Sequence, residues 1–424
     1  MKNSFDSYQL YRAGKAIKYT ARIKVVMKDE VDFNVLSNAV NKAAKRYPYF
    51  CVKTVIDEDG GYNLIENNRP VVTIHTRDNL PDLGSEEVNK HLIYVDTNGK
   101  EINFNICHAL GGGKGFTPWF ETTLYQYVCD KYNVELDCPN IIKPDSELLP
   151  NEDAQIDINV FKNVEPIKLS RKYKGKPLLF EYVNGLFNPF VKNPQHYIIS
   201  LDQKDILKYA KGNDSSVGSA FAVFMFKTMS KVLPANHKVI EVAMAHNPAD
   251  TFGYKNLHSD ILSHIHVAFK REMDNWGLEK VGTIARSQLY IQAEPGVSYN
   301  EILNRCIGIE GLDKVKGVKA KRKYAKKHCK NLGEGLSTYC CNVNYTGQRD
   351  WGELANYVES YVFVVDGHLL IEITSMSDKL FVCFLQMLKK DKYVKAFTQV
   401  LDELNIPYEI KGPFITNHPY VQLP

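Results

Sequence analysis

The stretch "INFNICHALGGGKGFTPWF", residues 102–120, contains residue types that could take part in catalysis or binding. Ile102, Phe104 and Ile106 alternate with polar residues, and His108 has the same parity. Because side chains alternate across a strand, His108 is expected to point to the buried side at the strand's end. An imidazole titrates near neutral pH and can take up a proton during a reaction. His108 is therefore a candidate catalytic base, with a packed core histidine as the alternative.

Glycines follow the histidine at positions 111, 112, 113 and 115. A phosphate-binding P-loop would need GxxxxGK followed by Ser or Thr, but His108 stands at the first glycine and Gly115 after the lysine. A dinucleotide fingerprint would need a third glycine where Phe116 stands. Close approach of the backbone to a ligand is one reason for glycine at a turn, so these glycines favour the catalytic interpretation of His108.

Two further clusters contain functional residue types. The stretch 313–330, "DKVKGVKAKRKYAKKHCK", holds nine Lys and Arg with one acidic residue. It predicts either a solvated helical face or a docking surface for an anion, such as the phosphates of coenzyme A or an acidic carrier protein. The second cluster contains four histidines without an HExxH motif, so we expect loop and packing roles rather than a metal site; they are His246, His258, His264 and His266.

The composition bounds the class of protein. The chain has 424 residues, 44% apolar and 24% charged, which is typical of a globular protein larger than one ordinary domain. A net charge of +4 is too small to argue for nucleic acid. The longest apolar run, "AFAVFMF", is too short to span a bilayer, and the first residues do not resemble a signal peptide. Nine cysteines at irregular spacing predict free thiols in a reducing cytoplasm.

The elements that must position His108 follow from apolar periodicity. A strand is expected over 21–28, a helix over 32–48 with buried Leu36, Ala39, Val40 and Ala43, and a helix after the glycines. Residues 138–195 are irregular and rich in Pro, Asn and Lys. After them a strand begins near 196, a helix follows with Asp214 as its predicted N-cap, and strands alternate with helices to the end, with a hairpin turn at Asp366-Gly367. The predicted class is α/β or α+β in two lobes, 1–165 and 196–424, joined by a linker over 166–195.

These segments together resemble one known family. "CHALGGGKG" at a strand end resembles the HxxxDG motif of the chloramphenicol-acetyltransferase-like acyltransferases, in the alcohol-acetyltransferase and condensation-domain branch. The helix, proline-containing turn and strand start over 33–53, the stretch 198–229, "CNVNYTGQRDWGELANYV" at 341–358 and the strands over 369–388 resemble the family's segments in the same order. The resemblance covers nearly the whole chain. It implies two lobes, each a mixed sheet flanked by helices, with a tunnel between them.

The resemblance also implies a reaction and its residues. An acyl group would pass from acyl-CoA to an alcohol or amine, with His108 as general base and no covalent intermediate or bound cofactor. Substrate and CoA contacts would come from Gly111, Gly112, Gly113 and Trp119, with Asn344, Tyr345, Thr346 and Ser375 (or Ser377) as candidate oxyanion donors. Core packing is the alternative for Trp119 and its neighbour Phe120. Partners would be acyl-CoA, a small acceptor and, in a carrier-dependent enzyme, an acyl carrier protein.

One position departs from the family motif. The aspartate four residues after the histidine, which in the family mainly braces the histidine loop through an arginine, is Gly112 here. The loss of this aspartate leaves two alternatives. The protein is an active enzyme with a weakened brace, or it is a non-catalytic relative that only binds a ligand or partner. If Arg286 or Arg305 lies near, Gly112→Asp is expected to leave activity similar or higher.

Overall fold

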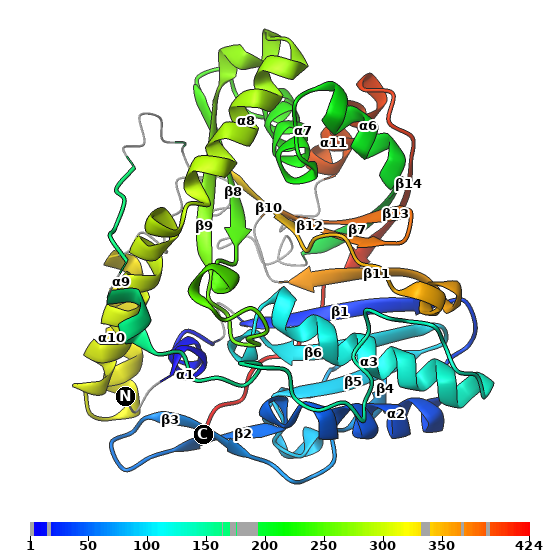
Figure 1. The fold of residues 1–424 in the computed structure, drawn as a ribbon, viewed down its shortest axis with the longest axis vertical. Coiled ribbons are helices and arrows are strands. Elements are labelled where there is room, and N and C mark those ends of the chain that lie inside the picture. The colour runs from blue at the N-terminus through cyan, green and yellow to red at the C-terminus, as the bar shows by residue number, and fades with distance from the viewer. Residues whose placement is uncertain are drawn as a thin grey trace.

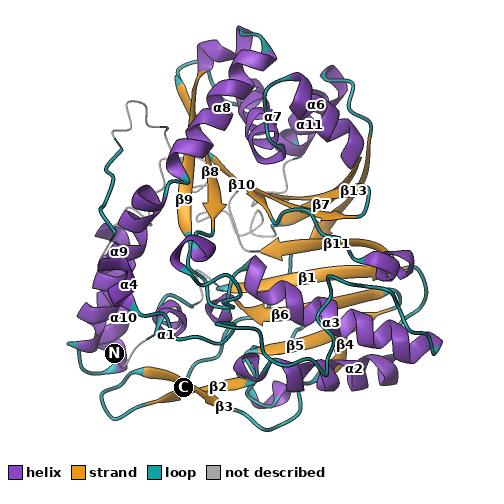
Figure 2. Ribbon diagram, in the orientation of Figure 1, coloured by secondary structure: helices purple, strands orange, loops and turns teal. Residues whose placement is uncertain are grey.

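The computed structural model describes residues 4–14, 18–162, 164–169, 175, 194–331, 340–365, 369–386 and 391–424. The chain forms two lobes, each built on one large sheet, with helices outside the sheets (Figures 1 and 2). The predicted fold class, a mixed α/β protein of two sheet-based lobes, is confirmed. Among the described residues, no helix is both long and apolar enough to cross a bilayer.

The first lobe holds a five-stranded sheet in the order β11-β1-β6-β5-β4. Its strands are β1 (Thr20–Met27), β4 (Thr73–His75), β5 (Ile93–Asn98), β6 (Glu101–Cys107) and β11 (Val358–Val365). A separate hairpin joins β2 (Val52–Ile56) to β3 (Tyr62–Glu66). The helices α2 (Phe33–Arg46) and α3 (Gly113–Tyr132) pack together on one face of the sheet (Figure 1).

The predicted apolar stripe explains the position of α2. Leu36, Ala39, Val40 and Ala43 are all fully buried, and the carboxylate of Asp32 caps the helix by accepting from the backbone NH of Val35. Apolar residues on one face at helical spacing hold a helix against a sheet because their burial removes apolar surface from water. The β6–α3 connection is thereby held over the same core.

The second lobe holds a seven-stranded sheet in the order β14-β7-β13-β12-β10-β8-β9. Its strands are β7 (Gln195–Asp202), β8 (Val239–His246), β9 (Ser263–Lys270), β10 (Cys341–Tyr345), β12 (Leu369–Met376), β13 (Lys379–Gln386) and β14 (Tyr408–Ile415). The helices α6 (Gln203–Gly212), α7 (Val217–Val232), α8 (Leu278–Gln292) and α11 (Lys392–Glu403) gather at its outer side (Figure 1).

One local prediction in this half is wrong. The N-cap of α7 is Ser216, whose hydroxyl accepts from the NH of Ser219, and not Asp214, which forms an ion pair with Arg286. The predicted turn Asp366-Gly367 lies outside the described residues. Among the described residues on either side of it, β11 pairs with β1 of the first lobe, and β12 pairs with β10 and β13.

Several segments tie the lobes together, so the sheets do not follow the sequence boundary near 195 everywhere. Strand β11 crosses into the first sheet, and Val421 of the C-terminal tail forms a β-bridge with Leu83. The remaining helices α1 (Phe5–Leu10), α4 (Ile158–Lys162), α9 (Pro295–Asp313) and α10 (Val318–Asn331) lie together at one side of the molecule (Figures 1 and 2). Apolar residues of α9 belong to the core of the first lobe.

Short 3-10 turns complete the described secondary structure. They are η1 (Pro48–Phe50), η2 (Glu86–Val88), η3 (His108–Leu110), η5 (Ala249–Phe252), η6 (Arg271–Asn275) and η7 (Gly352–Tyr357). The turn η3 connects β6 to α3 and begins with His108, so the candidate base lies where strand alternation ends.

Candidate active site

His108 lies in a partly open aromatic setting at the start of η3. Its backbone NH donates to the carbonyl oxygen of Tyr19 at 2.9 Å. The imidazole contacts the rings of Tyr19 and Phe116 edge to face, with centroids 5.8 and 6.0 Å away. The side chain is half-buried, and Nδ1 has no hydrogen-bond partner in the part of the chain that the structure describes. Because Nδ1 is also buried, another molecule would have to reach the imidazole at its other ring nitrogen, Nε2, to exchange a proton with it.

The glycines after His108 are explained by close approach, but of the chain itself. A β-carbon placed on Gly111 would lie 2.5 Å from the carbonyl oxygen of His258, and one on Gly115 would overlap the same oxygen. A β-carbon on Gly112 would lie 2.7 Å from Oδ1 of Asp260. Close approach to a ligand is one reason for glycine at such a turn. The described contacts at Gly111, Gly112 and Gly115 come from residues 258–260 of the second lobe, and these contacts by themselves explain glycine at the three positions.

The segment 258–260 is fixed to the first lobe by hydrogen bonds. The backbone NH and Nδ1–H of His258 both donate to the carbonyl oxygen of Glu152, at 3.1 and 2.8 Å. The imidazole of His258 stacks on Tyr49, with ring centroids 4.1 Å apart. His258 is therefore a packing residue at the contact between lobes, as predicted. In the described part of the chain, no group of three metal-ligating side chains is assembled.

Glu152 is itself part of a buried ion pair. Its carboxylate accepts two hydrogen bonds from Arg46, at 2.9 and 2.8 Å, and one from the hydroxyl of Tyr49 at 2.5 Å. Burial alone would raise the pKa of Glu152, but these bonds and the NH of Leu149 outweigh it and lower that pKa. This network anchors the residue that holds His258.

The helix α1 brings a second acid to the same place. Oδ2 of Asp6 accepts from the hydroxyl of Ser259 at 2.9 Å and lies 3.9 Å from Nε2 of His258. Burial raises the pKa of Asp6 to about 6, although His258 and Ser259 act in the opposite direction. No periodic or motif signal in the sequence pointed to Asp6 or to Asp260, because both reach the turn from distant parts of the chain.

The raised pKa of Asp6 gives a test by substitution. The folded-state value of about 6 lies above the ordinary 3.8, so the folded protein binds more protons and loses stability as the pH rises through this window. Asp6→Asn avoids that loss and keeps an acceptor for Ser259. We expect urea unfolding to show the variant more stable at pH 7.5 by roughly 1–2 kcal/mol, with the difference shrinking near pH 4. A variant less stable at pH 7.5 would mean that charged Asp6 stabilises the fold through His258.

Thr346, one of the predicted oxyanion donors, lies beside the glycine turn. Its methyl carbon would be 3.8 Å from a β-carbon placed on Gly113, so β10's end and the turn are neighbours. Its hydroxyl donates to the carbonyl oxygen of Ile373 at 3.2 Å. The hydroxyl of Ser375 donates to Gly347 O and accepts from Arg349 NH, both at 3.0 Å, and so shapes the loop after Thr346.

The other predicted donors have structural partners. The side chain of Asn344 accepts from the NH of Ala245 and donates to Glu372 at 2.7 Å, and burial raises the pKa of that carboxyl to about 7. Burial raises the pKa of Tyr345, whose hydroxyl bonds to Ser375. Ser377, the alternative to Ser375, is exposed at the turn between β12 and β13.

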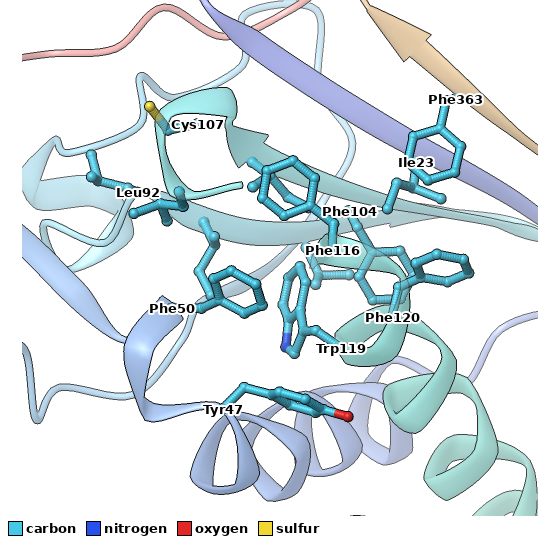
Figure 3. Close-up of a cluster of buried hydrophobic side chains, with 14 of the residues drawn as sticks. Ile23, Tyr47, Phe50, Leu92, Phe104, Cys107, Phe116, Trp119, Phe120 and Phe363 are labelled. Carbon is cyan, nitrogen blue, oxygen red and sulfur yellow. The ribbon is translucent and has the colours of Figure 1, made fainter. Parts of the chain in front are cut away.

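Trp119 lies in the hydrophobic core of the first lobe, which favours the packing alternative. Its side chain is fully buried and its ring contacts Phe50 and Phe104, as Figure 3 shows. Phe120 packs in the same cluster against Phe104 and Phe363. An acceptor-lining role for Trp119 has no support in its described contacts.

The two arginines considered as partners for position 112 lie in different places. Arg286 pairs with Asp214 on the surface of the second lobe. Arg305 is buried and donates to the carbonyl oxygens of Asp260 and Leu262, at 3.1 and 3.2 Å. Arg305 therefore holds the backbone of the segment that abuts Gly112.

Comparisons with known proteins identify solved structures that have a similar fold. No protein-family profile matches the sequence, and no curated protein matches it. Among solved structures, TRI101 from F. graminearum with ethyl coenzyme A is similar at 10% identity, with a TM-score of 0.59 over 97% of this chain and all of that one.

Two further structures are similar over most of their length. The TRI3 trichothecene 15-O-acetyltransferase from Fusarium sporotrichioides has 12% identity and a TM-score of 0.57 over 95% of this chain and 94% of that one. The epimerization domain of tyrocidine synthetase B has 9% identity and a TM-score of 0.56 over 94% and 92%. The chain thus has the two-lobed fold of the CoA-dependent acyltransferases and condensation domains, as the collinear sequence resemblance predicted.

Proposed function

We propose that this protein is an acyltransferase that moves an acyl group from acyl-CoA to an alcohol or amine, with His108 as general base. The observation that carries the proposal is the position of His108. A half-buried imidazole, whose Nδ1 is buried and has no hydrogen-bond partner among the described residues, begins the turn between β6 and α3, where segments of both lobes meet. The similarity to TRI101 with a bound coenzyme A derivative and to an acetyltransferase supports this class of reaction.

The proposed reaction needs one base and no covalent enzyme intermediate. His108 would take the proton from the acceptor hydroxyl or amine as its oxygen or nitrogen attacks the thioester carbonyl. The carbonyl oxygen becomes negatively charged, and Thr346, beside Gly113, is the proposed donor to it after its hydroxyl turns from Ile373. When the carbon–sulfur bond breaks, the imidazolium returns the proton to the leaving thiolate of CoA.

The proposal has a direct assay. Acyl-CoA thioesters of increasing chain length are mixed with panels of alcohols and amines, and the released CoA thiol is measured with a thiol reagent. We expect CoA release that depends on the acceptor. If no pair releases CoA and CoA itself does not bind in calorimetry, the alternative of a relative that binds another ligand replaces this proposal. The irregular cysteine spacing makes the reducing cytoplasm the proposed location.

The basic segment supports a role in docking the donor, although two of its residues serve the fold. Lys321 is buried and its Nζ donates to the carbonyl oxygen of Leu312 at 2.8 Å, and Arg322 donates to the carbonyl oxygen of Ala13. Joint replacement of Lys321, Arg322 and Lys323 would therefore disturb packing as well as charge. Exposed lysines of α10 remain available for an anion; they are Lys319, Lys323, Lys326 and Lys327.

Replacing Lys319, Lys323 and Lys326 together with glutamine is expected to weaken binding of acyl-CoA or an acyl carrier protein by about 3- to 10-fold at low salt. Exposed charges are screened beyond roughly 10 Å at 0.1 M salt, so raising the salt should reduce wild-type affinity toward that of the variant. The control is the same change at Lys204, Lys208 and Lys211, which are exposed on α6. Equal binding by both variants at every salt concentration would assign α10 to the solvated surface.

A further inference from the structure

The space beside Gly112 is occupied by a carboxyl group from the other lobe. Oδ1 of Asp260 lies 2.7 Å, and its Cγ 3.2 Å, from the point where a β-carbon of residue 112 would stand. Asp260 is only 8% exposed, so this acid is packed against the turn rather than solvated beside it. A side chain at 112 would require the carboxyl of Asp260 to move from this place.

The end of α3 favours a negative charge at this point, although repulsion between Asp260 and Asp6 acts against it. Gly112 is the N-cap of α3, a helix of 20 residues, and it provides no side-chain cap. The first NH groups of a helix lack intrahelical partners and give its N-terminus a partial positive charge. A carboxylate carried by Asp260 therefore lies at the end of α3 that favours it, which offsets part of the cost of burying the charge.

The backbone around Asp260 is fixed on both sides. Arg305 donates to the carbonyl oxygens of Asp260 and Leu262, and Ser259 donates to Asp6 of α1. The carbonyl oxygen of His258 fills the positions where Gly111 and Gly115 would carry side chains. The Asp260 carboxyl is thus presented to the turn by a segment with little freedom to move, which is the condition for a group that sets the position of another.

We propose that Asp260 is the positioning residue of the His108 turn, a carboxylate supplied by the second lobe in place of a side chain at residue 112. The inference rests on the proposed function, since His108 is the group whose position would matter. It also changes the expectation for Gly112→Asp. That substitution places a second carboxyl against Asp260, so we expect it to lower both stability and activity rather than preserve them.

The test moves the carboxyl from one lobe to the other. Asp260→Ala removes the carboxyl group, and Gly112→Asp adds a second carboxyl group that conflicts with that of Asp260. The double variant Gly112→Asp/Asp260→Ala moves the carboxyl group to residue 112. The Cβ of Asp260 lies 3.8 Å from the β-carbon position at 112, an ordinary contact, so the double variant has room for the new side chain. The control is Asp250→Asn, which removes an exposed carboxylate paired with Lys114 across the same lobe contact.

Two readouts separate this inference from the proposed function. With an active acyl donor and acceptor, we expect each single variant to lower kcat by about 10- to 100-fold with little change in KM, because small displacements of a catalytic group cost rate rather than binding. The double variant should recover most of the loss, and Asp250→Asn should match the wild type.

Without any substrate, amide hydrogen exchange at residues 108–116 should be faster in both single variants and restored in the double variant. Wild-type exchange and wild-type kcat in Asp260→Ala would overturn the inference. A double variant no better than Asp260→Ala in either readout would do the same. If the wild type transfers no acyl group but the exchange pattern holds, the proposed reaction is wrong while Asp260 still positions the turn.

Discussion

His108→Ala is expected to reduce acyl transfer by about 10²- to 10⁴-fold, the range that a positioned general base contributes. The loss should appear in kcat, because the base acts on the acceptor's proton in the transition state and adds little to binding of the donor. The measurement is acceptor-dependent release of the CoA thiol by wild type and variant under saturating donor.

The fold should tolerate this change. The His108 imidazole makes ring contacts with Tyr19 and Phe116, and its Nδ1 has no partner among the described residues, so removing it breaks no side-chain hydrogen bond of that nitrogen. His75→Ala is the matched control, because His75 is exposed at the end of β4 and stacks only on Phe33 within the described contacts. Acyl transfer that survives in His108→Ala at the wild-type rate would remove His108 from the mechanism.

Arg46→Met is expected to destabilise the protein by about 3–5 kcal/mol, because it leaves the buried Glu152 carboxylate without its cation. The side chains of Arg46 and Glu152 are 2% and 4% exposed, so water cannot replace the lost charge. The carbonyl of Glu152 also holds His258, and through it the segment against the glycine turn, so activity should fall with stability.

The pH dependence of this variant has a definite sign. In the wild type the pKa of Glu152 is lowered, so its contribution is present above about pH 4.5 and is lost as the pH falls through the lowered value. In Arg46→Met the same carboxyl is buried without a cation, so its pKa should rise and acidification should stabilise the variant. Urea unfolding at pH 7 and pH 4.5 should therefore show a smaller difference at the lower pH.

A surface pair gives the control. Arg77 and Glu87 form an ion pair with side chains 49% and 64% exposed, and Arg77→Met should cost at most about 1 kcal/mol. Equal losses in Arg46→Met and Arg77→Met would show that the Arg46–Glu152 pair contributes no more than a solvated one. The double variant Arg46→Met/Glu152→Gln should recover part of the loss, since no buried charge is then left unpaired.

Local periodicity was sufficient for the elements that carry His108. The stripe of α2, the alternation of β6 and the helix after the glycines all follow from which residues are apolar at period 3.6 or 2. Periodicity could not determine the cap of α7 or the partner of β11. An N-cap depends on the backbone angles of one residue. The sequence of a strand does not show which strand, distant in the chain, will form hydrogen bonds with it.

The sequence by itself determined the two-lobed class, the strand that ends at His108 and the unusual absence of a side chain at 112. Only the tertiary structure showed why residue 112 has no side chain. The carbonyl of His258 and the carboxyl of Asp260 reach the turn from about 150 residues away in the chain. Such contacts depend on how the two lobes dock, and docking is set by the summed burial of both surfaces, which no local pattern of residues encodes.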